Sequence, residues 1–182
     1  HVVNKPAGEP VALTNGAEPV RSASYHPKDG NRILFLRDAG GSEKYQVFHL
    51  DVATKKTTML TDGKHRHTGA RWSPDGRRIV YFSPKRNGRD NDMYAMDPLK
   101  PGSEKLLAKL PGGGWGISDW SPDGRLLLVI EYLSINYSKI HIIDAVTGER
   151  SLFSPVTKAK VSHGLARFDP KMRAVYYTCD ES

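Results

Sequence analysis

An aromatic residue, a tight turn and then an apolar run recur four times along the chain. The aromatic residues are Tyr25, Trp72, Trp120 and Phe168, so successive copies lie 47 or 48 residues apart. In the second and third copies the sequence reads Trp-Ser-Pro-Asp-Gly, where proline presets φ early in the turn and glycine closes it. A fixed period in a strand-rich sequence indicates a repeat architecture, because one repeat alone cannot bury its apolar face.

Each repeat predicts four strands in the same order. The aromatic residue ends the first strand, a run of β-forming residues makes the second, and a third strand ends in aspartate before a polar turn. The turns between third and fourth strands are residues 51–55 and 144–148. The predicted second strands are residues 32–37, 78–83, 126–132 and 174–179; the third are 46–51, 93–97 and 139–144; the fourth are 57–61, 104–109 and 150–154.

Four antiparallel strands per repeat predict an all-β fold, a fragment of a β-propeller built from four-stranded antiparallel blades. A closed propeller typically has about 4–8 blades, so residues 1–182 form a partial ring that missing sequence or a second copy completes. We therefore expect a piece of a longer protein. An open antiparallel sandwich is the alternative, but sandwiches do not repeat one motif at a fixed period. The predicted parts are an outer strand of a preceding blade at 10–14, blades at about 20–61, 68–109 and 116–154, and a truncated blade at 164–182.

Composition limits the classes of partner. A hydrophobic content of 38% over 182 residues suits one globular domain, and no apolar stretch approaches the roughly 18 residues of a membrane helix. The formal charge is +7, but 27 basic residues are interleaved with 20 acidic ones, which favours a solvated surface over nucleic-acid binding. Cys179 is alone and can form neither an internal disulfide nor a metal site by itself. We expect no nucleic acid, no membrane and no cofactor.

Strands that alternate in direction place the Pro-Asp-Gly turns on one face of the disc and the long polar loops on the other. Binding residues concentrate on loops of this kind, which a rigid scaffold positions. For each single residue, a solvated loop side chain is the simpler interpretation. The loops are residues 38–45, 84–92 and 133–138 within blades, and 62–67, 110–116 and 155–163 between them. The candidate substrate or interface residues are Glu43, Arg86, Arg89, Trp115, Tyr137 and His163.

Two patterns resemble metal sites only loosely. His65 and His67 form a pair, but no third or fourth zinc ligand follows at a usual spacing. Residues 86–92 are rich in Asn, Asp and Gly, yet they lack the closing glutamate and the ligand spacing of an EF-hand loop. We therefore predict no metal site.

The sequence also offers no catalytic constellation. Asp75 and Asp123 look like paired carboxylates, but their place within a turn explains them. The chain contains no Gly-x-Ser-x-Gly nucleophile motif, and no Gly-Lys-Ser/Thr follows the glycine cluster at residues 112–116. We expect no catalytic residue in this chain.

The tandem Trp-Ser-Pro-Asp-Gly units resemble the repeats of TolB-like and peptidase-associated propellers. Residues 37–48, 85–94 and 179–182 resemble propeller segments of the prolyl oligopeptidase family of serine peptidases, particularly its bacterial acylaminoacyl-peptidase and dipeptidyl-peptidase-like members. The Gly-Gly-Ser-Glu loop before Tyr45 is the most specific match. Two departures are Lys171-Met172 in place of Asp-Gly in the fourth repeat and the inserted Lys28 in the first.

This resemblance implies an N-terminal propeller that gates peptide access to a C-terminal α/β-hydrolase domain with a Ser-Asp-His triad. The implied partners are that domain and a peptide substrate, and the sequence stops before any triad residue. Dipeptidyl-peptidase-type members hold a substrate amine with a pair of glutamates; no matching segment exists, and Glu43 is a lone candidate.

Two other functions stay open. A TolB-like propeller without a hydrolase would bind protein partners through the same loops. The fragment could also associate with copies of itself, because unpaired strands at its open blade edges template pairing. The parent is expected to be a serine peptidase, in the bacterial cytoplasm or in the periplasm or secreted.

Overall fold

The computed structural model describes residues 8–16, 18–38 and 40–180. This part of the chain contains strands and no helix, hence no helix that could cross a membrane. Blade 1 comprises β1 (Val20–Tyr25), β2 (Arg32–Arg37), β3 (Gln46–Asp51) and β4 (Thr57–Met59). Blade 2 comprises β5 (Thr68–Trp72), β6 (Ile79–Ser83), β7 (Asp92–Met96) and β8 (Lys105–Ala108). Blade 3 comprises β9 (Trp115–Trp120), β10 (Leu126–Ser134), β11 (Tyr137–Asp144) and β12 (Arg150–Leu152); β13 (His163–Phe168) and β14 (Val175–Cys179) begin blade 4.

Within each blade, consecutive strands are neighbours and antiparallel. The sheet orders are β1-β2-β3-β4, β5-β6-β7-β8 and β9-β10-β11-β12, with β13 paired to β14. The predicted all-β class of four-stranded antiparallel sheets is confirmed. In the predicted outer strand at residues 10–14, the structure has only an isolated β-bridge at Val11, and residues 181–182 lie outside the described residues.

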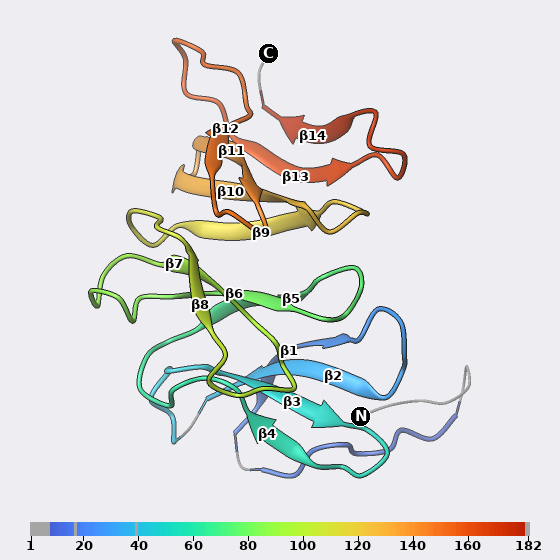
Figure 1. Cartoon of the computed structure of the whole chain (residues 1–182). Helices are drawn as coiled ribbons and strands as arrows, with labels where there is room; N and C mark the ends of the chain where they lie inside the picture. Colours follow the sequence, from blue (N-terminus) through green and yellow to red (C-terminus); the bar gives the residue numbers. More distant parts are fainter. Residues whose placement is uncertain (1–7, 17, 39, 181–182) are drawn as a thin grey trace.

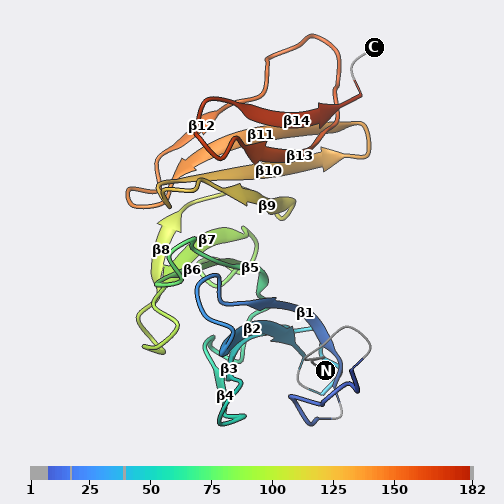
Figure 2. The ribbon, with the colours of Figure 1, turned by 90° about the vertical axis from the view of Figure 1, so that its right-hand side faces the viewer.

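The blades stack face to face along the chain (Figure 1). Figure 2 shows β1, β5 and β9 on one side of the stack and β4, β8 and β12 on the other. The first strands of adjacent blades contact one another, β5 with β9 and β9 with β13. They therefore occupy the inner edge, which lines the central channel in a closed propeller.

The core lies between the blades. Leu34 and Leu36 of blade 1 pack with Trp72 and Tyr81 of blade 2. Phe82 of blade 2 shares a second cluster with residues of blade 3. The middle strands of a blade are covered on both faces, so they are almost continuously apolar, as the sequence of β6, Ile-Val-Tyr-Phe-Ser, illustrates. The third cluster, between blades 3 and 4, contains Leu128, Ile140, Ala166 and Phe168.

The Pro-Asp-Gly turns, together with the β3–β4 and β11–β12 turns, form what we call the turn face, at the right of Figure 1. The Ser73 hydroxyl donates to Asp75 (2.6 Å) and accepts from the Arg78 backbone (3.0 Å). The hydrogen bonds from Ser73 and from the Arg77 backbone hold the pKa of Asp75 below its usual range. This carboxylate thus closes the turn.

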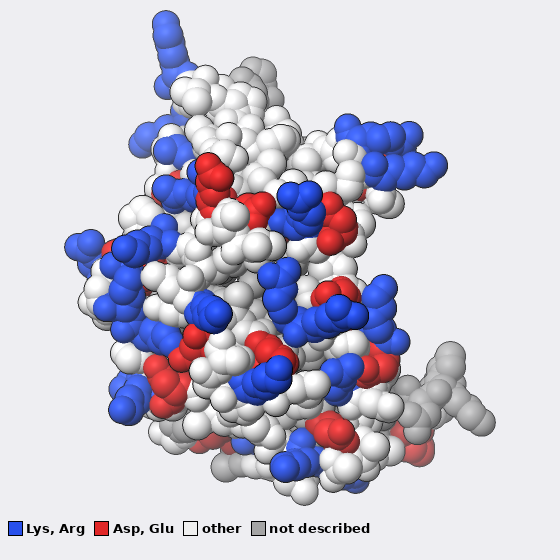
Figure 3. All heavy atoms as spheres, in the orientation of Figure 1, with Lys and Arg blue, Asp and Glu red and all other residues white. Residues whose placement is uncertain are grey.

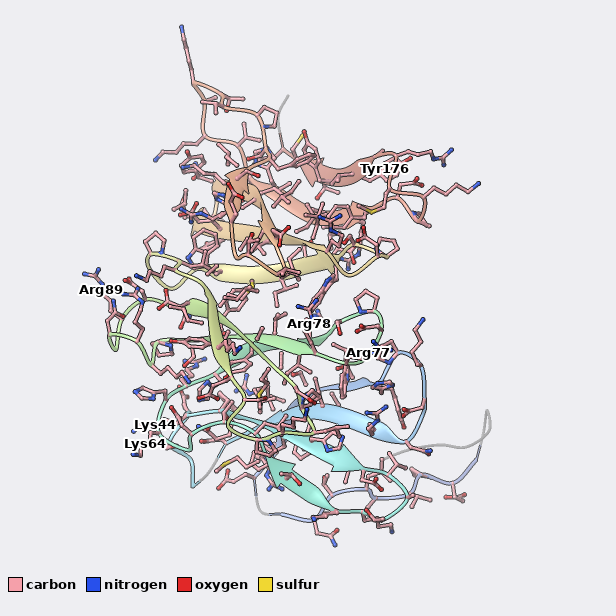
Figure 4. All side chains as sticks on the ribbon, viewed as in Figure 1. Lys44, Lys64, Arg77, Arg78, Arg89 and Tyr176 are labelled. Carbon is pink, nitrogen blue, oxygen red and sulfur yellow. The ribbon has the colours of Figure 1, made fainter. Side chains whose placement is uncertain are left out.

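Arg78 ties blade 2 to blade 3 at the turn face. Its guanidinium donates to the carbonyls of Ala145 (2.9 Å) and Gly124 (3.4 Å), and Figure 4 shows the side chain between the two blades. Trp72 connects blades 2 and 1 in a similar way, because its indole Nε1 donates to the Ser24 carbonyl at 3.2 Å. The turn face is therefore linked from blade to blade.

Candidate functional site on the loop face

We call the opposite side the loop face; it consists of residues 38, 40–45, 60–67, 84–91, 109–114, 134–137 and 153–162. Figure 4 shows Lys44, Lys64 and Arg89 on this side, at the left. Acidic and basic side chains are interspersed over the view in Figure 3. Four of the six predicted candidate residues lie in these loops, and Trp115 and His163 each begin the strand that follows one of them.

Arg86 and Arg89 meet at one carboxylate. Arg86 Nη2 lies 3.1 Å from Asp90 Oδ2, and Arg89 Nε lies 3.2 Å from Asp90 Oδ1. Arg86 also pairs through Nε with Asp92, which is fully buried. The Gly112 backbone donates to Asp90 at 2.9 Å, and this bond leads the interactions that lower the pKa of Asp90. Arg86 is thus part of a structural ion network, whereas Arg89 is 82% exposed.

Trp115 is buried rather than presented to solvent. Its Nε1 donates to the Pro111 carbonyl at 2.8 Å, and its ring centroid lies 5.2 Å from that of His141. The Arg150 guanidinium stacks over the indole at 5.2 Å. Trp115 therefore anchors the loop between blades 2 and 3.

Tyr137 and His163 lie on either side of Ser138. The Ser138 hydroxyl accepts from the His163 backbone (2.6 Å) and donates to its carbonyl (2.7 Å), and His163 Nδ1 lies 3.0 Å from the Ser138 carbonyl. His163 is buried, while Tyr137 is half-buried with Lys139 over its ring at 5.5 Å. His163 is held in place by blade 3.

Glu43 has an exposed side chain in the first loop of the face. Its φ of 57° places it in the left-handed region, and its backbone donates to Asp38 Oδ2 at 2.8 Å. Next to this loop, the guanidinium groups of Arg21 (5.1 Å) and Arg66 (5.6 Å) each lie over the Tyr45 ring. Glu43 therefore lies in blade 1, whereas the Arg86 network belongs to blade 2.

One structural position is equivalent in blades 1, 2 and 3 but holds a different residue in each. The buried side chain at the start of the third strand is Gln46 in blade 1, Asp92 in blade 2 and Ser138 in blade 3. Each hydrogen-bonds the segment that leads to the next blade: Gln46 Oε1 accepts from the Gly63 backbone (2.9 Å), Asp92 Oδ1 from the Leu110 backbone (2.8 Å), and Ser138 from His163.

A polar cluster joins the loops of blades 1 and 2. Asp62 bonds His65 Nδ1 (2.7 Å) and His67 Nε2 (3.2 Å). Burial alone would raise the pKa of Asp62, but the hydrogen bonds from His65 and its neighbours lower it well below its usual range. Burial lowers the pKa of His67, whose ring packs against Tyr81. Both histidines share one carboxylate, and the described residues contain no group of three or more His, Cys, Asp or Glu side chains suited to a metal ion.

Sequence patterns did not point to Arg71 and Arg167, which line a pocket on the inner edge of the blades. A signal exists, because each directly precedes the aromatic residue of its repeat. The same position is Ser24 in the first repeat and Asp119 in the third. Aligning the repeats at their aromatic residues would have shown that this position varies in charge.

No protein-family model matches the chain. The uncharacterized peptidase YuxL of Bacillus subtilis is 30% identical to it over 150 residues, which cover 79% of this chain and 22% of the relative. The Tol-Pal system protein TolB of Alcanivorax borkumensis is 30% identical over 97 residues, which cover 53% of this chain and 22% of TolB. The chain thus spans about a fifth of the length of the curated relatives it matches.

Solved structures share the fold. TolB from Acinetobacter baumannii has a TM-score of 0.59 at 25% identity, over 90% of this chain and 38% of that chain. A prolyl endopeptidase has a TM-score of 0.62 at 14% identity, over 89% and 26%. An oligogalacturonate lyase in complex with manganese has a TM-score of 0.69 at 17% identity, over 92% and 47%.

These likenesses concern one architecture that carries several functions. The fold is a β-propeller shared with peptidases and with TolB. The sequence match to a peptidase extends over most of the chain, whereas the match to TolB extends over about half of it. By fold and by sequence, the chain is a β-propeller segment related to the N-terminal propeller portion of prolyl-oligopeptidase-type peptidases, as its motifs predicted.

Proposed function

We propose that this chain is a non-catalytic propeller segment of a prolyl-oligopeptidase-type serine peptidase, which gates access of peptides to an α/β-hydrolase domain and contacts that domain. The observation that carries the proposal is the 30% identity to a peptidase over 79% of the chain. The loop face supports it, since rigid blades position polar loops of different sequence there. The acylaminoacyl- or dipeptidyl-peptidase type stays a prediction.

The chemistry of both faces also supports a non-catalytic role. The Asp62–His67 pair ends against the phenol ring of Tyr81, and Asp75 is held within its turn. A triad needs a nucleophile within hydrogen-bond reach of a base that a third group orients. We assign that triad to the hydrolase domain.

A serine-directed phosphonate probe tests whether the nucleophile lies in the hydrolase domain and not in the propeller segment. The chain by itself should not be labelled, while a longer protein that contains it should be labelled once, at a serine in a Gly-x-Ser-x-Gly motif that follows the propeller. Stoichiometric labelling of the chain would overturn the non-catalytic role. A longer protein without such a motif would instead favour the TolB-like binding propeller, the second candidate, which the A. borkumensis match supports.

Self-association through open blade edges is a separate proposal about the chain alone. β14 pairs only with β13 among the described strands, and Tyr176 on it is 64% exposed (Figure 4). An unpaired strand of this kind templates pairing with another chain. Light scattering at micromolar concentration should give an even-numbered oligomer, and a clean monomer would exclude it.

A further inference from the structure

A pocket of about 520 Å³ lies on the inner edge of blades 2, 3 and 4. Its size is in the range of roughly 300–1,000 Å³ that is usual for small-ligand sites. It is built from the first strands β5, β9 and β13, with β10 at one end. The residues that line it include Arg71, Ile117, Ile130, Tyr132, Leu165 and Arg167.

The charge of this pocket is entirely positive. Arg71 and Arg167 line it, and no aspartate or glutamate does. The carboxylates of the adjoining strands are engaged elsewhere: Asp119 Oδ2 accepts from the Phe168 backbone (2.8 Å), and Glu131 Oε2 bonds His141 Nε2 (2.8 Å). Two guanidinium groups therefore face one hollow without a protein counter-ion.

Both arginines keep donors free. The Arg71 side chain is exposed and makes no hydrogen bond or ion pair with any described residue. Arg167 uses Nη1 to reach the carbonyls of Ser118 and Ala166, which fixes the direction of its side chain and leaves Nε and Nη2 unused. The Ser118 hydroxyl donates to the Ala166 carbonyl at 2.9 Å and holds β9 against β13. The Arg167 donors are thus preorganised, whereas the Arg71 donors are held by no hydrogen bond among the described residues.

Apolar side chains complete the pocket. Ile117 and Ile130 contribute partly buried surface, while Leu165 and Tyr132 are 69% and 56% exposed. Leu165 also has a φ of 43°, in the left-handed region that a leucine rarely adopts. Strained backbone that displays a large apolar side chain is typical of ligand sites. The pocket pairs a cationic end with an apolar wall.

We propose that this pocket binds a carboxylate of a peptide, which forms charge-assisted hydrogen bonds with Arg71 and Arg167 while a neighbouring apolar side chain packs on Tyr132 and Leu165. The geometry of guanidinium donors suits a carboxylate. The choice of a peptide over other carboxylates rests on the proposed function. The carboxylate is either the C-terminus of the peptide or an acidic side chain.

Isothermal titration calorimetry on the chain tests the ligand chemistry. The probes are alanyl-alanyl-leucine as the free acid, its C-terminal amide, the amidated peptide alanyl-glutamyl-leucine, and a galacturonate trimer. We expect the free acid to bind about tenfold or more tightly than the amide, which loses the charged acceptor. Binding of the amidated glutamyl peptide would assign the site to acidic side chains, and its failure to bind would assign it to the C-terminus.

Matched variants locate the binding site. Arg71→Gln should weaken binding of the free acid about tenfold, and Arg167→Gln should weaken it further or equally. Arg77→Gln is the control, because Arg77 is exposed on the turn face, away from the pocket (Figure 4). An unchanged thermal midpoint separates lost binding from lost folding, and Arg71→Gln removes no hydrogen bond or ion pair with a described residue.

Three results overturn the proposal: equal binding of the free acid and of both amidated peptides, unchanged binding by Arg71→Gln, or tighter binding of the galacturonate trimer than of the peptide. The measurement needs no hydrolase. It therefore succeeds or fails independently of the phosphonate labelling that tests the partnership with a hydrolase domain.

Discussion

On the turn face, blades 2 and 3 repeat the same hydrogen bonds, whereas on the loop face each blade uses a different side chain at one equivalent position. Ser73 and Ser121 both donate to the aspartate two residues later, at 2.6 Å in each blade. At the start of the third strand, Gln46, Asp92 and Ser138 bond the next connection through an amide, a carboxylate and a hydroxyl.

The difference follows from what each face requires of the backbone. The turn needs a left-handed residue, which is Gly76 in blade 2 (φ 74°) and Gly124 in blade 3 (φ 73°). A blade connection needs only a buried partner for its backbone groups, and many polar side chains supply one. The turn therefore keeps its sequence in blades 2 and 3, and the loop face and inner edge can differ in chemistry.

The largest expected effect is at the aromatic residues beside the turns. Trp72→Ala and Trp120→Ala should each lower the free energy of unfolding by about 3–5 kcal/mol, because each removes a large ring from between two blades. Urea denaturation measures the loss. A loss below about 1 kcal/mol, the range of surface substitutions, would show that the repeat does not carry the core.

The phenylalanine variants sharpen this test. Trp72 Nε1 donates to the Ser24 carbonyl, whereas Trp120 Nε1 is buried without a partner among the described residues. Trp72→Phe should therefore cost about 1 kcal/mol more than Trp120→Phe. Equal costs would mean that this bond between blades contributes no net stability.

Alanine variants of two glycines with the same backbone conformation compare the packing of the turn face with that of the loop face. Gly148 (φ 75°) lies in a turn of the turn face, where an added Cβ would be 1.7 Å from the Leu107 carbonyl oxygen of blade 2; Gly88 (φ 74°) lies on the loop face with open space around it. Gly88→Ala should cost about 1 kcal/mol for the left-handed conformation alone. Gly148→Ala should cost about 3 kcal/mol or more, because a backbone must also move. Thermal and urea unfolding of both variants measure the contrast, and similar losses would contradict close packing at the turn face.

The repeated turns made the fold predictable, because the turn motif and the apolar runs carry the period. The ends of the fourth strands of the blades were less predictable. The fourth strands end at Met59 and Leu152, two residues before their predicted ends. Beyond these ends, the side-chain hydroxyls of Thr61 and Ser154 accept hydrogen bonds from the backbone of Val47 (3.0 Å) and Ile140 (3.2 Å).

Functional candidates were harder to predict, because a sequence places a residue in a loop but does not reveal its partners. Trp115 and His163 turned out to be buried, and Arg86 is bonded to two aspartates. Arg71 and Arg167 were missed because they lie in strands, where alternation favours a structural interpretation. The fold brings them to one pocket only by placing the inner edges of three blades side by side, and a single sequence does not show this arrangement.

At the start of the third strand, blades 1, 2 and 3 have Gln46, Asp92 and Ser138. The charged side chain, Asp92, should contribute most to stability. Asp92→Ala should lower the free energy of unfolding by about 2–3 kcal/mol, since it removes the acceptor of the Leu110 backbone and leaves Arg86 with Asp90 alone. Ser138→Ala should cost about 1 kcal/mol. Urea denaturation compares them, and the reverse order would show that the three side chains are not equivalent supports.

The smallest effect is a pH dependence from a buried histidine of the loop face. Burial lowers the pKa of His67, and the bond to Asp62 only partly offsets this. The unfolded chain therefore binds a proton below about pH 6.5 that the folded chain resists, so stability is full above that pH and falls as the pH drops toward the lowered pKa. One pH unit below 6.5 the loss is at most about 1.4 kcal/mol for this residue. Urea midpoints at pH 7.5 and 5.5 should differ less for His67→Gln than for the parent, and an unchanged difference would remove His67 from the pH response.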